Sequence, residues 1–236
     1  MNVANKNFHT GVETVVISLG GSLIIPEELD VDFLKAFRDL ILSHVAQGKK
    51  FIIITGGGKI CRKYQDAAKK IKETSSDDLD WLGIYATRFN AEFLKILFGD
   101  LAENQIILDP TLQVVFDKSI VVGGGWKPGW STDYDAVLLG KQLGAKKIIN
   151  LSNTDYVYDK DPKKYSDAKK IDKISWAEYR ALIPKEWNPG LNSPFDPIAS
   201  EMAEKEGIQV MIMNGKPIDN LAKCLNGEAF NGTIIS

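Results

Sequence analysis

Three apolar segments in the first half of the chain each end in a run of glycines. The apolar segments are residues 15–19, followed by Gly20-Gly21; residues 51–55, followed by Gly56-Gly57-Gly58; and residues 120–122, followed by Gly123-Gly124-Gly125. Because glycine lacks a Cβ atom, the backbone N–H groups of such a run can close around an anion at the end of a strand. A tight turn is the alternative for any single run. Three such runs after β-rich segments favour phosphate binding.

Composition narrows the class of protein. The 236 residues are 44% hydrophobic and 25% charged, with a net charge of −2, as in an ordinary globular protein. This charge favours neither nucleic acid nor an anionic membrane as a partner. Cys61 and Cys224 are too few and too far apart for a disulfide framework or a metal cluster, and they suit a reducing cytoplasm. Residues 1–13 are expected to form a loose terminal segment rather than a signal peptide.

Helical and strand patterns alternate along the rest of the chain. The strands are continuously apolar, which indicates that helices cover both faces of their sheet. We therefore expect an α/β fold, a three-layer αβα sandwich with a central, mostly parallel sheet. The polar residues 74–78 predict a break, and residues 184–197 predict a long loop near a site. Helices are expected near residues 31–47, 59–72, 79–98, 132–143, 175–183, 198–206 and 218–225, and strands near 51–55, 105–108, 119–122, 147–151, 208–213 and 233–235.

The common phosphate-binding motifs are absent from the sequence. Gly58-Lys59 is followed by Ile60 rather than by the Ser or Thr of a P-loop, and no strand leads into G-x-G-x-x-G. What remains is a set of glycine amides, cations and carboxylates, which suits phosphoryl transfer because that reaction depends mainly on positioning and charge. Lys59 and Arg62 follow the second glycine run, where they can bind phosphate oxygens. Exposed helix charges are the alternative explanation for both.

Six segments together resemble the amino-acid-kinase superfamily, and within it the archaeal type of uridylate (UMP) kinase. The resemblance covers nearly the whole chain from about residue 14, as a single domain over 14–236. It implies an acceptor-binding half to about residue 145 and an ATP-binding half after it. The matching segments are Leu19-Gly20-Gly21-Ser22, residues 55–59 with Arg62, residues 83–91, residues 124–133, residues 152–158 with Asp161-Pro162-Lys163, and residues 210–214 with 231–235.

The resemblance also implies roles for individual residues. Lys59, Arg62 and Asp133 would be catalytic, with Asp133 orienting the cations that neutralise the transferred group. The residues expected at ATP are Gly20, Gly21, Ser22, Gly58, Arg62, Ser152, Asn153, Asp155, Tyr158, Asp161 and Lys163. The residues expected at UMP are Gly57, Asp80, Trp126, Lys127, Pro128, Gly129, Trp130, Ser131 and Thr132. We call residues 126–132 the acceptor loop.

Some of these residues also have simpler explanations. An acid such as Asp80 at a helix start can serve the helix dipole alone. Tyr158 and Asp161 can belong to an ordinary turn, since Asp-Pro is a common turn sequence. In the acceptor loop, Pro128-Gly129 predicts a turn and residues 131–133 a helix start able to receive a phosphate.

Three positions depart from the family pattern. Ser18 stands where many members have a lysine that neutralises transition-state charge, Tyr156 stands in place of a glycine, and Glu201 stands where archaeal relatives often have lysine. The missing cation at residue 18 must come from elsewhere. Lys59 or Arg62 is the expected replacement, with Lys127 and Lys163 behind them.

The function implied by the resemblance is ATP-dependent phosphorylation of UMP to UDP, a step of pyrimidine nucleotide biosynthesis. ATP would bind as its magnesium complex, with no metal held by the protein alone, in a cytoplasmic homohexamer. One alternative is a kinase of the same superfamily for another small acceptor. For isopentenyl phosphate, however, the expected histidine after the second glycine run is missing. The other alternative is a non-catalytic protein that binds nucleotides or oxoanions.

Overall fold

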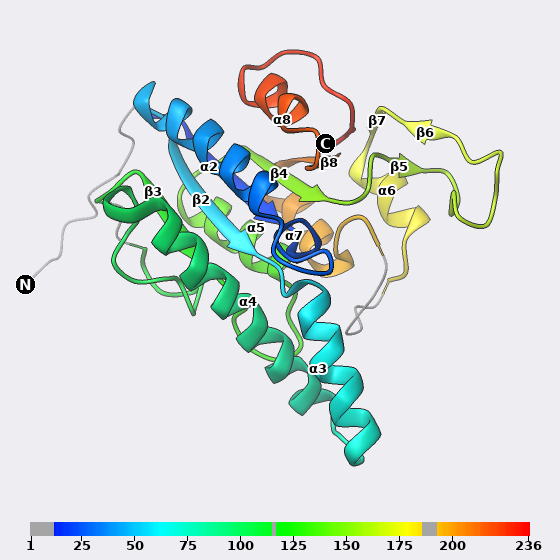
Figure 1. Cartoon of the computed structure of the whole chain (residues 1–236). Helices are drawn as coiled ribbons and strands as arrows, with labels where there is room; N and C mark the ends of the chain where they lie inside the picture. Colours follow the sequence, from blue (N-terminus) through cyan, green and yellow to red (C-terminus); the bar gives the residue numbers. More distant parts are fainter. Residues whose placement is uncertain (1–11, 115–116, 186–192) are drawn as a thin grey trace, which may run out of the picture.

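A seven-stranded sheet forms the centre of the computed structural model, which describes residues 12–114, 117–185 and 193–236 (Figure 1). Within these residues the strand order is β3-β2-β1-β4-β8-β9-β7. All neighbours pair in parallel except β8 and β9. The strands are β1 Thr14–Leu19, β2 Lys50–Thr55, β3 Ile120–Gly123, β4 Lys147–Ser152, β7 Lys173–Ile174, β8 Gln209–Asn214 and β9 Thr233–Ile235. The predicted α/β fold with a mostly parallel sheet is confirmed.

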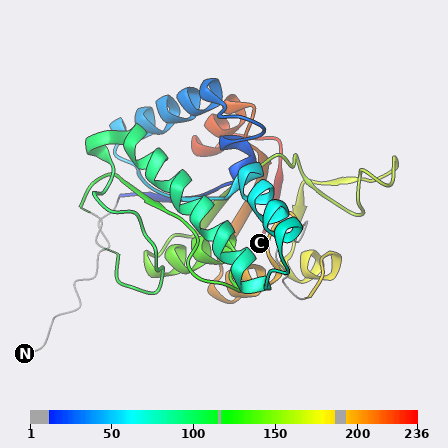
Figure 2. The same cartoon turned by 60° about the horizontal axis from the view of Figure 1, so that its bottom comes forward.

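Helices cover both faces of this sheet, as Figures 1 and 2 show. One apolar core joins a sheet face to α2, α4 and α8, and the other joins the opposite face to α5, α6 and α7. The three-layer arrangement is therefore confirmed. The helices are α1 Gly21–Ile24, α2 Val31–Ala46, α3 Gly58–Ile71, α4 Ser76–Phe98, the 3-10 turn η1 Gly99–Leu101, α5 Thr132–Gln142, α6 Trp176–Leu182, α7 Pro197–Glu206 and α8 Ile218–Leu225.

The two cores divide each central strand between them. In β2, Phe51 and Ile53 face the core of α2 and α4, whereas Ile52 and Ile54 face the core of α5. All four are fully buried, and each contributes about 1.5–3 kcal/mol to folding by leaving water. This two-sided burial explains why the strands are continuously apolar rather than alternating.

Two predicted elements differ in the structure. Residues 105–108 are not a strand, and only Ile107 forms an isolated bridge, with Gly123. The apolar pair there reflects packing, because Ile106 contacts one core and Ile107 the other. The predicted break at residues 74–78 is present but shorter, since α3 ends at Ile71 and α4 already begins at Ser76, where Ser75 accepts a hydrogen bond from the Asp78 amide and caps the helix.

The region directly after β4, where no helix or strand was expected before residue 175, contains two short strands. Strands β5 Val157–Tyr158 and β6 Lys170–Ile171 pair in antiparallel fashion. They form an arm that projects from the sheet in Figure 1. Residues 1–11 of the predicted loose terminus and residues 186–192 of the predicted 184–197 loop lie outside the described residues. No helix in the described parts of the chain is long and apolar enough to cross a membrane.

The three glycine runs end neighbouring strands. Strands β3, β2 and β1 are adjacent, so their carboxyl ends meet at one edge of the sheet, where α/β proteins bind ligands. The first two runs also touch each other through their backbones. A Cβ atom on Gly21 would overlap the Gly58 nitrogen and lie 2.6 Å from the Gly58 Cα. Glycine is therefore required here by packing between the turns.

We expect Gly21→Ala to lower the free energy of unfolding by about 2–3 kcal/mol, because the added methyl group separates the two turns. Urea unfolding followed by circular dichroism measures this loss. Gly140→Ala is the matched control: it lies within α5, where a Cβ atom would make only ordinary contact with Ile148, at 3.5 Å. The control should be neutral or gain about 0.5–1 kcal/mol from helix propensity. Equal stability of the two variants would contradict the packing argument.

Candidate active site

The second glycine turn begins α3. Gly57 caps this helix, and its first turn contains no acidic residue. The helix dipole and unpaired N–H groups at such a start attract phosphate. Lys59 forms an ion pair with Glu27, whereas Arg62 is exposed and forms no ion pair or hydrogen bond with any other described residue. Of the two predicted cations, Arg62 is the one with all its donors available.

Ser18 is part of a polar cluster around Asp133. The Ser18 hydroxyl donates to Asp133 Oδ1 at 3.0 Å, and Asn150 Nδ2 donates to the same oxygen at 2.9 Å. Ser18 and Asn150 are register partners on β1 and β4. The Asp196 amide donates to Asp133 Oδ2 at 3.2 Å. The position that holds lysine in many family members therefore binds the carboxylate at the start of α5.

Asp133 shares this cluster with a second carboxyl group. Burial and the nearby Asp196 raise the pKa of Asp133 to about 7, against the hydrogen bonds from Ser18, the Asp196 amide and Asn150. Burial also raises the pKa of Asp196, which caps α7 by accepting from the Ala199 amide at 2.7 Å. Asn150 and Asp196 are not among the predicted site residues. The Asp196-Pro197 sequence at a helix start was a detectable signal for the second.

Asp80 and the acceptor loop come together, as predicted. Asp80 Oδ2 accepts a hydrogen bond from the Gly129 amide at 2.9 Å. Gly129 has a φ of +86° and follows Pro128 in the predicted turn. Ser131 accepts from the Tyr134 amide at 3.2 Å and caps α5, as expected of a helix start. Since α4 begins at Ser76, Asp80 lies beyond its first turn and its partner is the loop.

Aromatic rings line the acceptor loop. The rings of Trp126 and Trp130 are 5.9 Å apart, and Trp130 lies 4.2 Å from Tyr134 of α5. The Lys127 ammonium lies 3.9 Å from the centre of the Trp126 ring, a cation–π contact. These contacts give the loop, which is mostly half-buried, a defined shape.

Helix α4 holds two of the glycine turns through side chains that sequence reasoning missed. Arg88 Nε donates to the Gly125 carbonyl at 3.1 Å. Thr87 Oγ1 accepts from the Gly125 amide at 2.7 Å. Asn90 Nδ2 donates to the Gly56 carbonyl at 2.8 Å. All three lie within the segment 83–91 that carries the family resemblance, which was the available signal.

The predicted donor side begins at the end of β4. The Gly20 amide donates to the Leu151 carbonyl at 2.7 Å, which ties the first glycine turn, including Gly21 and Ser22, to the segment Ser152-Asn153. Asn214, at the end of β8, donates to Asp155 Oδ1 at 2.9 Å. The structure therefore brings the first glycine turn close to the start of the segment 152–155, which is predicted to bind ATP.

The remaining donor-side residues lie in the arm. Tyr158 belongs to β5, and Asp161 Oδ1 accepts from the Lys163 amide at 2.9 Å. The Asp161 carbonyl also accepts from the Lys164 and Tyr165 amides. Asp161 therefore forms a turn, as its simpler explanation predicts. The contacts described for Asp161 and Lys163 remain within the arm.

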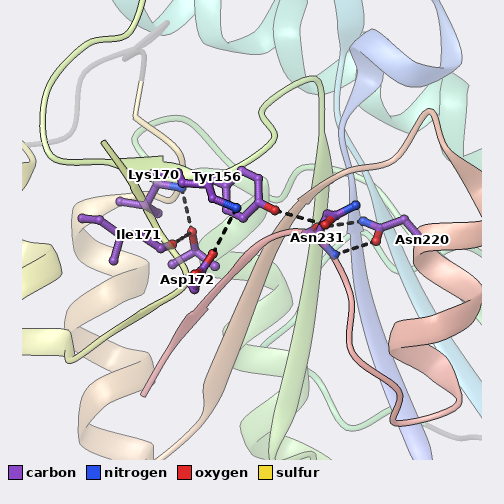
Figure 3. A network of polar contacts seen from close by, with 8 residues as sticks. Tyr156, Lys170, Ile171, Asp172, Asn220 and Asn231 are labelled. Carbon is purple, nitrogen blue, oxygen red and sulfur yellow. Dashed lines mark hydrogen bonds and ion pairs between the residues drawn. The ribbon is translucent and has the colours of Figure 1, made fainter. Parts of the chain in front are cut away.

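Tyr156, which replaces the family glycine, ties the arm to the C-terminal loop (Figure 3). Its hydroxyl donates to Asn231 Oδ1 at 3.2 Å, and Asn220 bonds the backbone of Asn231 on both sides. The Lys170 ammonium lies 4.7 Å from the Tyr156 ring centre and 3.7 Å from Asp172. The Tyr156 side chain therefore contacts both β6 and the loop that leads to β9.

Known proteins are similar to this chain, in sequence and in structure, over nearly its full length. The model of the amino acid kinase family matches residues 13–214. The uridylate kinase of Methanobrevibacter smithii is 33% identical over 94% of this chain and 99% of its own, and that of Staphylothermus marinus is 36% identical over 94% and 98%. The crystal structure of uridylate kinase from Archaeoglobus fulgidus aligns with a TM-score of 0.79 at 33% identity, covering 94% of this chain and 99% of that one.

We expect Ser18→Ala to raise the pKa of Asp133 above about 7, because the Ser18 hydrogen bond lowers it. The rise should be about one unit or less, the effect of one hydrogen bond to a carboxylate. Carbon-13 NMR titration of labelled aspartates measures it. Ser22→Ala, in the glycine turn that follows β1, is the control and should leave this pKa unchanged. A Ser18→Ala value at or below wild type would contradict the assignment.

Proposed function

Because the chain belongs to the amino acid kinase family, we propose that it transfers the γ-phosphoryl group of ATP to UMP and so makes UDP. Relatives named uridylate kinase, 33–36% identical over nearly their whole length, support this acceptor. The observation that carries the proposal is the shared edge of the sheet. There the two touching glycine turns end β1 and β2, Arg62 lies in α3 directly after the second turn, and the acceptor loop follows the third glycine run at the end of β3.

The chemistry assigned to these groups is direct in-line transfer. A phosphate oxygen of UMP attacks the γ-phosphorus, and the bond from this phosphorus to the β–γ bridging oxygen breaks, so ADP leaves. Backbone N–H groups of the glycine turns hold the donor phosphates, and Gly57 at the start of α3 receives the acceptor phosphate. No protein nucleophile takes part.

Arg62 supplies the cation that a lysine at residue 18 would otherwise provide. Its guanidinium can bind two phosphate oxygens at once, and no described side chain competes for it. Lys59 is already paired with Glu27. Ser18 instead helps to hold Asp133, which orients the cations around the transferred group.

Mg²⁺ belongs to the proposal as the partner of ATP. In kinase sites it is coordinated mainly by phosphate oxygens and water, with one or two carboxylates at most. The carboxylates of Asp133 and Asp196 at this edge are hard oxygen donors of the kind that suits it. When bound, the ion would neutralise part of the negative charge on the phosphates. We also propose a cytoplasmic location, which the unpaired Cys61 and Cys224 fit.

A coupled assay of ADP formation with ATP and Mg²⁺ tests this function. UMP, dUMP, CMP and UDP are offered as acceptors to the purified protein. UMP should be used best, with UDP as product. Absence of UDP formation, together with no detectable binding of UMP, would refute the proposal.

Two variants should separate the donor side from the acceptor side. Arg62→Ala should lower kcat/KM for ATP about 100-fold, because a transition-state charge contact is lost. Asp80→Asn should raise KM for UMP about tenfold and leave kcat within threefold, since an amide offers one acceptor oxygen where the carboxylate offers two, one for the Gly129 amide and one for a hydroxyl of UMP. Steady-state kinetics, with ATP and UMP varied in turn, measures both effects. Negligible effects of both changes would contradict the site assignment.

We further propose a homo-oligomer, a hexamer in line with the family resemblance. Its support is one apolar face of α4 that is left exposed, with Tyr85 63%, Phe89 76% and Ile96 70% accessible. Residues 85, 89 and 96 lie on the same side of a helix. Exposed apolar faces of this kind mark protein interfaces, and a self-complementary face joins two copies.

Ile96→Glu should break this contact, because a buried charge opposite its own copy is unfavourable. We expect analytical ultracentrifugation to show a smaller assembly than for the wild type. Leu182→Glu, at an exposed position at the end of α6, is the control and should keep the wild-type size. An unchanged assembly in Ile96→Glu would exclude this face as an interface.

A further inference from the structure

The peptide group of Trp126 is held from both sides. Its amide donates to Asp135 Oδ2 at 3.2 Å, and its carbonyl accepts from Arg88 Nη2 at 2.6 Å. Trp126 is the first residue of the acceptor loop, directly after the third glycine turn. Two helices, α4 through Arg88 and α5 through Asp135, therefore fix the point at which the loop begins.

Asp135 is an unusual residue for its position. It is 1% exposed and faces the core side of α5 beside Ala136 and Val137. Its second oxygen, Oδ1, has no hydrogen-bond partner among the described residues. A buried carboxyl group with a single bond is unfavourable, and a leucine of the same shape would avoid this desolvation cost. The hydrogen bond to the Trp126 amide is the interaction that offsets part of this desolvation cost.

The Trp126 amide needs one acceptor oxygen, which Asp135 Oδ2 supplies. An asparagine side chain has nearly the shape of aspartate and keeps one acceptor oxygen, whereas leucine keeps the shape and removes the acceptor. Asparagine can therefore reproduce this contact, and leucine cannot.

The far part of the loop is held separately. Gly129 is bonded to Asp80, and Trp130 stacks on Tyr134, the neighbour of Asp135 in α5. Lys127, between these points, is exposed. A change at the Trp126 amide should therefore alter how the loop starts without releasing its other end.

We propose that Asp135 is a positioning residue that holds the Trp126 amide and thereby sets the shape in which the acceptor loop binds the nucleoside monophosphate. This rests on the proposed function, because the loop matters to catalysis only if it receives UMP. Asp135 acts through the backbone of Trp126 and does not itself touch the reacting atoms.

The test compares Asp135→Leu with Asp135→Asn, two side chains of nearly the same shape, in the full-length protein. Hydrogen exchange of the peptide covering residues 122–131, without ligands, reports the loop directly. We expect exchange at least tenfold faster in Asp135→Leu and within threefold of wild type in Asp135→Asn. In the kinetic assay, Asp135→Leu should raise KM for UMP about tenfold and leave KM for ATP and kcat within threefold, and Asp135→Asn should restore KM.

Each result decides the question. Wild-type exchange and KM for UMP in Asp135→Leu would overturn the proposal, as would equal losses in both variants or an equal rise in KM for ATP. If Asp135→Leu fails to fold, Asp135→Ala replaces it in both measurements with the same expectations. If the wild-type protein does not phosphorylate UMP, the proposed function fails. The exchange comparison then decides by itself whether Asp135 positions the loop.

Discussion

The site depends on the direct contact between the first two glycine turns. Gly21 and Gly58 meet backbone to backbone, at a distance that leaves no room for a Cβ atom. This contact fixes the ends of β1 and β2 relative to each other, and the Gly20 amide extends the connection to β4 through Leu151. The N–H groups at this edge are therefore positioned before any ligand binds, which is the condition for effective charge stabilisation.

Around this contact the protein gathers carboxyl groups whose burial is unfavourable for folding. Asp133 and Asp135 both have pKa values raised mainly by burial, to about 7 and about 8. A carboxyl whose folded pKa exceeds its unfolded value lowers stability as pH rises from about 4 toward the folded pKa. For Asp133, the hydrogen bonds from Ser18 and Asn150 offset only part of this loss of stability. Residues that reduce stability in this way are typical of functional sites.

Helix α4 connects the two halves of the site. Its apolar side packs on the sheet through Leu94 and Phe98, while Asn90 and Arg88 bond the carbonyls of Gly56 and Gly125. At its start, Asp80 bonds the acceptor loop. One rigid element thus sets the second and third glycine turns and the loop in register, because a helix moves as a unit. The same helix leaves a third, apolar face exposed to solvent.

The sequence alone determined the parallel sheet, its helical layers and the edge at which the glycine turns meet, because these follow from local apolar patterns and chain punctuation. The family resemblance also predicted roles for Asp80, Asp133 and the acceptor loop, and the structure joins Asp80 to this loop through Gly129. The sequence pattern misjudged residues 105–108, whose apolar side chains contact both cores and which form one isolated bridge rather than a strand. Only the tertiary structure decided that Ser18 binds Asp133 and that Lys59 is engaged by Glu27. It alone placed Asp135 against the Trp126 amide. Several of these contacts join residues that are far apart in the chain. Each contact depends on which side chains the packed elements bring within hydrogen-bond distance. A local sequence pattern does not encode that distance.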